Sequence, residues 1–288
     1  MIWISDAWKD YEVLDTSNGE RLERWGKYIL VRPDPQVIWN TPHRAKEWKN
    51  FDAKYIRSNT GGGRWTDHDL PERWQIKYKD YLTFNVKPMN FKHTGVFPEQ
   101  AANWDFIREK VSFAGRPVRV LNLFAYSGGA TLAAAAGGAE VFHVDASKGM
   151  VQWAKETAVA SGLSGCPIHW MVDDCAKFIQ REIRRGRKYD GIIMDPPSYG
   201  RGPGGEIWKM ETSFYPFLQE VVKVLSEDPL FVIINSYTTG LAPSAVAYAS
   251  DVVFGAKYGG KTEAGELGLP VKESGLILPC GATGRWTP

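Results

Sequence analysis

The chain has 288 residues, 43% of them hydrophobic and 24% charged, which is enough for a sizeable core. Its formal net charge of +2 is too small to indicate a polyanionic partner by itself. We expect no membrane span, because no apolar run approaches roughly 18–20 residues, and no signal peptide, because the first residues lack a basic and an apolar region. Three scattered cysteines (Cys166, Cys175 and Cys280) exclude a disulfide framework or a zinc site. We therefore expect a cytoplasmic protein with no metal.

Residues 1–94 are expected to form a small β-rich domain. Residues 27–32 are apolar and β-prone and are followed by Pro33, and residues 74–86 alternate polar and apolar side chains. Seven of the twelve tryptophans precede residue 95. Exposed tryptophans between Lys and Arg can stack on nucleic-acid bases, but small β-domains also use tryptophan as a core residue. We favour the core interpretation.

Residues 95–288 read as an alternation of helices and strands. A helix is predicted over 101–113, strands over 118–124, 140–144, 168–172, 191–194 and 230–235, and further helices over 130–136, 148–161, 175–185, 212–225 and 243–253. Strands separated by such helices form right-handed βαβ units and a parallel sheet. A strand over 272–279, after the glycine-rich stretch 259–270, is expected to complete a hairpin antiparallel to the sheet edge. The fold class is therefore α/β.

The first loop at the carboxyl ends of these strands is Asn122-Leu-Phe-Ala-Tyr-Ser-Gly-Gly129, where a ligand is expected in such a sheet. Its two glycines let the backbone approach a ligand and point the next helix N-terminus toward it. It lacks the GxGxxG spacing of a dinucleotide site, which disfavours an NAD-dependent oxidoreductase, and it lacks the lysine of a P-loop. Taken alone, the loop is equally compatible with a structural turn.

Acidic residues end the next two strands. Asp145 lies about 20 residues beyond the glycine turn, where a carboxylate can accept hydrogen bonds from both ribose hydroxyls of an adenosyl group. Its structural alternative is to cap the following helix. Asp173 or Asp174, with the backbone N–H of Cys175, can meet the edge of an adenine or cap a helix instead. The glycine loop and Asp145 together favour an adenosyl cofactor.

The sequence Asp195-Pro-Pro-Ser-Tyr-Gly200 directly follows the apolar strand 191–194. Two prolines stiffen this loop and hold its backbone carbonyls in place. With Asp195, these carbonyls form a group of acceptors that can hold an N–H₂ group with its lone pair toward a methyl donor, and Tyr199 can stack on a planar acceptor. A surface turn of this composition after a buried strand would be unusual, so we favour a functional role.

In this order and spacing, the four loops resemble motifs I to IV of the class I methyltransferases that use S-adenosylmethionine (SAM). With HTGVFPEQ (93–100), the element Asp145-Ala-Ser147 and the tail LPCGATGRW (278–286), residues 92–288 are similar to the group that includes the ribosomal large-subunit RNA methyltransferases. This group contains C5-methylcytosine and N7-methylguanine enzymes. The resemblance implies a Rossmann-like domain over 95–288 with a mostly parallel seven-stranded sheet, SAM as cofactor and S-adenosylhomocysteine as product.

The resemblance also implies roles for individual residues. The cofactor's methionine end would lie between Phe97–Gln100 and the glycine loop, its ribose at Asp145 and its adenine at Asp174. The residues implied to contact the cofactor are Phe97, Gln100, Asn122, Phe124, Ala125, Ser127, Gly128, Gly129, Asp145, Ala146, Ser147, Asp174, Cys175 and Asp195. Those implied to act at the reacting group are Asp195, Pro196, Pro197 and Tyr199.

Two features depart from this group. Its C5-methylcytosine enzymes use a cysteine nucleophile from the loop after the fourth or fifth strand, whereas loops 195–200 and 235–240 contain no cysteine. Cys175 and Cys280 lie elsewhere and are expected to be buried, inert thiols. No RNA-binding module such as a PUA domain is recognisable in residues 1–94.

We therefore expect direct methyl transfer to a nitrogen or oxygen, with a ribosomal RNA base as the acceptor that the resemblance implies. The missing RNA-binding module and the weak net charge keep a second hypothesis open, in which the acceptor is a small molecule or a protein side chain. A third hypothesis is a non-catalytic, SAM-binding RNA scaffold, against which the intact DPP sequence argues.

Overall fold

The computed structural model describes residues 1–58, 62–66, 68–201 and 207–288, and the chain forms two compact units. The first, here called the α/β unit, consists of Met1–Trp3, Ala102–Leu267 and Gly281–Pro288. The second, the β unit, consists of Ile4–Ala101 and Gly268–Cys280. In the described ranges no helix is long and apolar enough to cross a membrane. The boundary expected after residue 94 stays a prediction.

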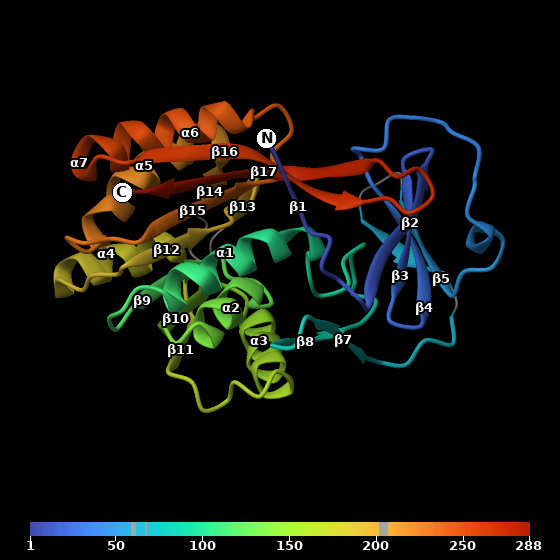
Figure 1. Cartoon of the computed structure of the whole chain (residues 1–288), viewed down its shortest axis with the longest axis horizontal. Helices are drawn as coiled ribbons and strands as arrows, with labels where there is room; N and C mark the ends of the chain where they lie inside the picture. The colour runs from blue at the N-terminus through green and yellow to red at the C-terminus, as the bar shows by residue number, and fades with distance from the viewer. Residues whose placement is uncertain (59–61, 67, 202–206) are drawn as a thin grey trace. The chain divides into compact units, whose positions relative to one another are not determined.

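An eight-stranded sheet forms the centre of the α/β unit, in the order β1-β16-β17-β15-β12-β9-β10-β11 (Figure 1). The five strands from β15 to β11 in this order are parallel, and β17 is antiparallel to β15. The strands are β1 Ile2–Ile4, β9 Arg119–Leu123, β10 Glu140–Asp145, β11 Ile168–Val172, β12 Gly191–Met194, β15 Phe231–Ser236, β16 Lys261–Pro270 and β17 Ile277–Thr287. The expected Rossmann-like, mostly parallel sheet is confirmed.

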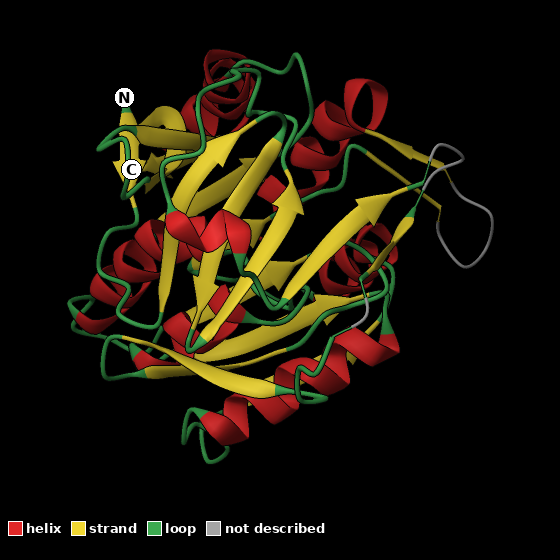
Figure 2. Cartoon of the chain, turned by 90° about the vertical axis from the view of Figure 1, so that its right-hand side faces the viewer, coloured by secondary structure: helices red, strands yellow, loops and turns green. Residues whose placement is uncertain are grey.

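Helices follow the strands of the sheet and pack beside it (Figure 2). Right-handed crossovers place α2 and α3 on one face and, because the chain reverses direction after β11, α4 and α5 on the other. The helices are α1 Ala101–Ser112, α2 Gly129–Ala136, α3 Lys148–Ala160, α4 Cys175–Arg185, α5 Met210–Val221, η3 Val222–Val224, α6 Pro243–Ser250, the π-helical turn η4 Asp251–Gly255 and α7 Ala256–Tyr258. The core between sheet and helices includes Leu121, Ile192 and Phe178, all almost fully buried.

The sequence of α4 explains both its position and its ends. It begins where the Asp174 side chain accepts from the backbone N–H of Lys177, and it ends at Gly186, whose φ of 65° is in the left-handed region. Its buried residues recur at helical spacing and are Cys175, Phe178, Ile179 and Glu182. The apolar stripe faces the core, which leaves the basic side chains of α4 on the opposite face.

The β unit contains a five-stranded sheet in the order β2-β3-β4-β5-β6 and the hairpin β7-β8. The elements are β2 Tyr11–Ser17, β3 Glu20–Trp25, β4 Tyr28–Pro33, η1 Lys46–Lys49, β5 Ala53–Arg57, β6 Gly63–Trp65, β7 Trp74–Tyr78, β8 Leu82–Val86 and η2 Pro98–Gln100. Of the seven N-terminal tryptophans, Trp25 is fully buried and the other six are half-buried. Tryptophan therefore serves mainly as packing here, and the expected β-rich region is confirmed.

A fully buried carboxylate ties strands β2, β3 and β4 together. Glu23 accepts hydrogen bonds from the Tyr11 hydroxyl at 2.6 Å and from two nitrogens of Arg32 at 2.5 and 2.7 Å. Burial alone would raise the pKa of Glu23, but Arg21 and Arg32 outweigh burial and lower this pKa to about 2. A buried charge is tolerated because it is fully paired.

Two details of the predicted sheet are wrong. The sheet has eight strands and not seven, because β1 adds to it. The strand β1 has only three residues, which are too few to show a periodic pattern in the sequence. The predicted strand 272–279 also begins too early: β17 starts at Ile277, and β16 occupies most of the glycine-rich stretch. At Gly265 a Cβ atom would lie 2.3 Å from the carbonyl oxygen of Met1, so glycine marks close backbone approach here and not a loop.

Candidate functional site

The chain changes direction across the sheet at β9 and β12, which lie side by side. From β9 it continues outward to β10 and β11, and it then returns to form β12 on the other side of β9. Leu123 and Met194, the last residues of these two strands, are register partners. The loops that follow them, the glycine loop and the DPP loop, therefore start next to each other at the topological switch point, where open α/β sheets bind ligands.

The glycine loop has an unusual backbone. Phe124 and Tyr126 have φ values of 56° and 48°, in the left-handed region that residues with a Cβ rarely adopt. The loop is held by backbone hydrogen bonds from Ala125 to Val144 at 3.1 Å and from Gly128 to Ala125 at 3.0 Å. Backbone strain of this kind persists only where the surroundings enforce it, and it concentrates at functional sites.

Asp145 holds this loop in place from the end of β10. Its Oδ2 accepts from the backbone N–H of Tyr126 and its Oδ1 from that of Ser147, both at 2.8 Å. Burial raises the pKa of Asp145, and the two backbone hydrogen bonds counteract part of that rise. The cap of α3 is Ser147, which accepts from the N–H of Met150 at 3.3 Å, so the helix-cap interpretation of Asp145 is wrong.

Gly128 and Gly129 are required by packing. Gly128 is the N-cap of α2 with a φ of 87°, and a Cβ there would lie 3.0 Å from the Cβ of Ala154. At Gly129 a Cβ would lie 2.7 Å from the indole of Trp104. In the described part of the chain, no side chain forms a cap hydrogen bond with α2. The first backbone N–H groups of a helix have no partner within it, so those of α2 can donate to a ligand.

A buried polar network lies beneath the loop. Asn122 donates to the Thr131 hydroxyl at 2.9 Å, and this hydroxyl lies 2.9 Å from Nδ1 of His143. Burial lowers the pKa of His143 to about 3, which keeps the imidazole neutral. The side chain of Asn122 thus forms an internal hydrogen bond, and through Thr131 it connects β9 to α2 and β10.

The loop after β11 lies at the start of α4. Asp174 caps the helix through a 2.9 Å hydrogen bond from the N–H of Lys177, as one of the two interpretations expected, and Asp173 pairs with Arg181. The buried thiol of Cys175 accepts from the N–H of Phe124 at 3.2 Å and so supports the glycine loop. Burial raises the pKa of Cys175 strongly, which makes it an inert thiol.

The DPP loop is held in place at Pro197 and Ser198. The carbonyl of Pro197 accepts from the indole N–H of Trp208 at 2.6 Å, and the hydroxyls of Ser198 and Thr238 are 2.8 Å apart. Pro196 is buried, as expected for a rigid turn that leaves the sheet. Thr238 belongs to the loop after β15, so two adjacent strand-end loops are joined.

Tyr199 lies on a strand that the sequence did not predict. It begins β13 (Tyr199–Arg201), which pairs antiparallel with β14 (Ile207–Lys209). The Tyr199 side chain is 51% exposed, and its hydroxyl accepts from Nε of Arg201 at 3.0 Å. Its ring is therefore accessible for stacking.

Sequence reasoning also missed an aromatic cluster formed by Phe124, Trp208 and Phe217. The Phe124 ring centroid is 5.4 Å from that of Trp208 and 5.8 Å from that of Phe217, and the last two are 5.5 Å apart. The cluster connects the glycine loop, β14 and α5. No sequence signal marks Trp208, since its position depends on the pairing of β14 with β13.

Phe97 and Gln100 belong to the β unit. The backbone N–H of Gln100 donates to the carbonyl of Phe97 at 3.1 Å across the turn η2, and the Phe97 ring packs edge-on against His93. Gln100 is 8% exposed. The expected roles of Phe97 and Gln100 toward a cofactor stay predictions.

Residues 24–223 match the sequence model of the S-adenosylmethionine-dependent methyltransferases. The chain belongs to this family. The crystal structure of a SAM-dependent methyltransferase from Agrobacterium tumefaciens is 38% identical, with a TM-score of 0.93 over 100% of this chain and 93% of that one. SAM is therefore the cofactor that the family membership implies for this chain.

Two curated relatives are each named ribosomal RNA large subunit methyltransferase K/L. The protein of Shewanella loihica is 33% identical over 202 residues, which is 69% of this chain and 24% of the relative. That of Shewanella frigidimarina is 30% identical over 169 residues, which is 58% of this chain and 22% of the relative. The matched region thus spans about a quarter of the length of these relatives.

Proposed function

We propose that the protein transfers a methyl group from SAM directly to a nitrogen or oxygen atom of an RNA base, with ribosomal RNA as the substrate. The observation that carries this proposal is the DPP loop, a rigid set of acceptors at the switch point, directly beside the glycine loop. The names of the curated relatives support RNA as the substrate. A ribosomal substrate supports the cytoplasmic location that we propose.

The groups around the glycine loop fit SAM chemically. Both carboxylate oxygens of Asp145 retain lone pairs beyond their backbone hydrogen bonds, so they can accept from two ribose hydroxyls. The N–H groups at the start of α2, to which no described side chain forms a cap hydrogen bond, suit the carboxylate of the methionine moiety. Asp174 and the backbone N–H of Cys175 would meet the adenine, with Ala125, Ser127 and the glycines lining the cofactor.

At the acceptor, the residues of the DPP loop orient the reacting atom. SAM supplies an electrophilic methyl group when bound, so the protein mainly has to align the acceptor with it. Asp195 and the carbonyl of Pro196 would accept hydrogen bonds from an N–H₂ group and direct its lone pair toward the methyl group. As the bond from the acceptor to the methyl carbon forms, the bond from that carbon to sulfur would break, and the acceptor would lose a proton to the carboxylate of Asp195. Tyr199 would stack on the base.

The state of the cysteines supports direct transfer. Covalent C5 methylation needs a thiolate, and burial raises the pKa values of Cys175 and Cys280. Cys175 is also engaged beneath the glycine loop. Transfer to nitrogen or oxygen requires no such nucleophile, so these thiols are compatible with the proposed reaction.

The test is transfer of a radiolabelled methyl group from SAM by the purified protein into separate RNA, protein and small-molecule fractions. We expect label in RNA, lost on ribonuclease treatment. Label confined to protein or to small molecules would contradict the RNA assignment, and no label in any fraction, with SAM binding intact, would contradict the enzymatic one.

A further inference from the structure

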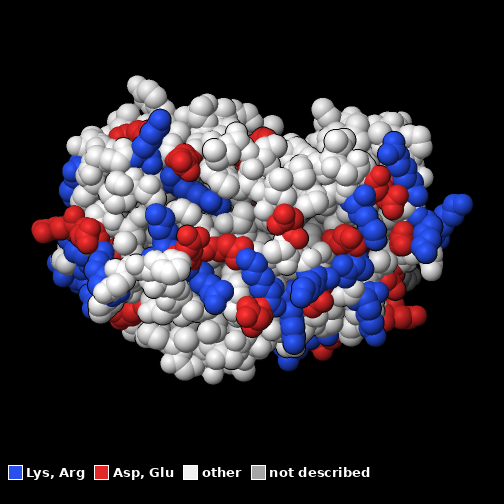
Figure 3. All heavy atoms as spheres, viewed as in Figure 1, with Lys and Arg blue, Asp and Glu red and all other residues white. Residues whose placement is uncertain are grey.

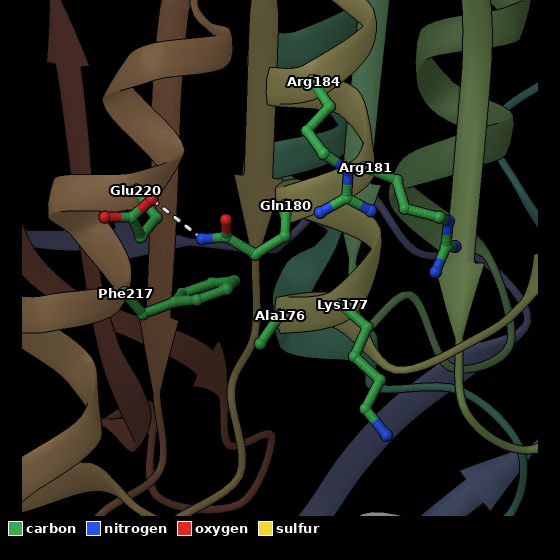
Figure 4. Close-up of a pocket in the computed structure, with 7 residues that line it drawn as sticks. All are labelled: Ala176, Lys177, Gln180, Arg181, Arg184, Phe217 and Glu220. Atoms are coloured by element: carbon green, nitrogen blue, oxygen red, sulfur yellow. Dashed lines mark hydrogen bonds between the residues drawn. The ribbon is translucent and has the colours of Figure 1, made fainter.

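A basic groove runs between α4 and α5 in the α/β unit. Its volume is about 410 Å³, and its lining residues are Ala176, Lys177, Gln180, Arg181, Arg184, Phe217 and Glu220. Figure 4 shows the basic side chains projecting from α4, with Phe217 and Glu220 contributed by the neighbouring helix. Phe217 belongs to the aromatic cluster that contacts the glycine loop, so the groove adjoins the candidate site.

The positive charge of the chain is concentrated in this region. Residues 175–188 contain six Lys or Arg and one Glu, whereas the rest of the chain contains 29 basic and 32 acidic residues. The segment therefore has a net charge of +5 and the remainder −3. On the face drawn in Figure 3, basic and acidic side chains are interspersed. A nearly neutral protein thus carries one strongly basic segment.

Nearby acidic groups hold this segment in place and offset part of its charge. The fully buried Glu182 accepts from Arg185 at 2.9 Å and lies 3.6 Å from Arg187, which fixes both guanidinium groups at the end of α4. Glu220 accepts from Gln180 at 2.8 Å and from Lys223 at 2.6 Å, so a second cation offsets its charge. Asp173 pairs with Arg181. Lys177 and Arg184 are exposed along the same helix.

We propose that the basic surface of α4 and of the segment directly after it, formed by Lys177, Arg181, Arg184, Arg185, Arg187 and Lys188, binds the phosphate backbone of the RNA substrate. The proposal rests on the proposed function and adds where the RNA is held. Lys177 and Arg184 are seven residues apart, or about 10 Å along the helix, which is long enough to contact more than one phosphate. The RNA contacts would be independent of base sequence and would guide a strand toward the switch point.

The experiment compares RNA binding by the wild-type protein with that of the triple variant K177Q/R181Q/R184Q. The probe is an in-vitro transcript of large-subunit ribosomal RNA, and affinity is measured at several salt concentrations. Each lost phosphate contact lowers the slope of log K against log[salt] by about 0.7–0.9. We expect the slope to fall by about 2 and affinity at low salt to fall at least about tenfold, with unchanged SAM affinity and thermal midpoint.

A matched control removes three other exposed lysines of the α/β unit in the variant K110Q/K257Q/K261Q. It loses the same charge, so an effect of net charge alone would appear in both variants, and equal losses would overturn the assignment to α4. Unchanged RNA affinity in the α4 variant, beside a wild-type protein that methylates RNA, would overturn this inference and leave the proposed function standing. A wild-type protein that neither binds nor methylates the transcript would overturn the proposed function itself.

Discussion

The carboxylate of Asp145 accepts a 2.8 Å hydrogen bond from the backbone N–H of Tyr126, a residue held at a φ of 48°. A side chain at the end of one strand thus fixes the strained loop at the end of its neighbour. The second oxygen accepts from the N–H of Ser147 at the start of α3. The residue expected to bind the ribose therefore also shapes the glycine loop.

Replacing Asp145 with Asn should weaken SAM binding. Both carboxylate oxygens accept from backbone N–H groups, so the amide of Asn must direct its own N–H₂ toward one of these donors. An unsatisfied polar group of this kind costs about 1–3 kcal/mol, so we expect the dissociation constant of SAM to rise about 5- to 150-fold. Isothermal titration calorimetry measures it, and an unchanged constant would contradict this role.

Replacing Asp195 with Ala should abolish turnover while leaving SAM binding nearly unchanged. The residue follows β12 in the DPP loop and is proposed to orient the acceptor and receive its proton. General-base and orientation effects are worth about 10²–10⁴-fold, so kcat should fall at least about a hundredfold. Single-turnover methyl transfer with SAM affinity measured in parallel tests this, and full activity in the variant would rule the role out.

Replacing Gly129 with Ala should destabilise the α/β unit. The new Cβ would lie 2.7 Å from the ring of Trp104, and overpacking of this kind costs about 1–3 kcal/mol. Gly149 in α3 is the matched control, since a Cβ there would meet only the Ser147 hydroxyl, at 3.9 Å. G149A should be neutral or stabilising by up to about 1 kcal/mol. Denaturant unfolding measures both, and equal effects would contradict the packing argument.

The buried His143 should make the α/β unit less stable as the pH falls. Its pKa is near the ordinary 6.5 in the unfolded chain and is lowered by burial to about 3 in the folded protein. Between these values the unfolded state binds a proton that the folded state does not, so the free energy of unfolding decreases by up to about 1.4 kcal/mol per pH unit.

The variant H143Q isolates this contribution, because glutamine can keep a hydrogen bond to Thr131 and does not titrate. Between about pH 6.5 and pH 5, wild-type protein should lose about 2 kcal/mol more stability than H143Q. Above pH 6.5 the two should depend on pH alike. If the free energies of unfolding of wild-type protein and H143Q ran parallel over the whole pH range, His143 would not be held neutral in the folded protein.

The sequence predicts the α/β unit well because local and global signals agree there. Each strand from β9 to β12 is a short apolar run, and α4 has clear signals for both ends at Asp174 and Gly186. β1 and β16 were not foreseen, since three residues carry no periodicity and glycine usually argues against a strand. Their formation depends on backbone contacts such as that between Gly265 and Met1.

In the site, the sequence identifies the strand-end residues but not how they are used. Asp145 ends β10 and the DPP loop directly follows β12, while Asn122 forms part of a buried network. Trp208 and Tyr126 escaped notice because their roles arise from a hairpin pairing and a backbone torsion. Neither property is encoded in a short local motif.

Mass spectrometry of RNA nucleosides tests whether the protein methylates a nitrogen or oxygen of ribosomal RNA. RNA from cells lacking the gene is incubated with purified protein and SAM carrying an isotopically labelled methyl group, then digested and analysed. We expect one labelled nucleoside in large-subunit ribosomal RNA, methylated on nitrogen or oxygen and absent with D195A. A label on carbon 5 of cytosine, or no labelled nucleoside from an active SAM-binding protein, would contradict it.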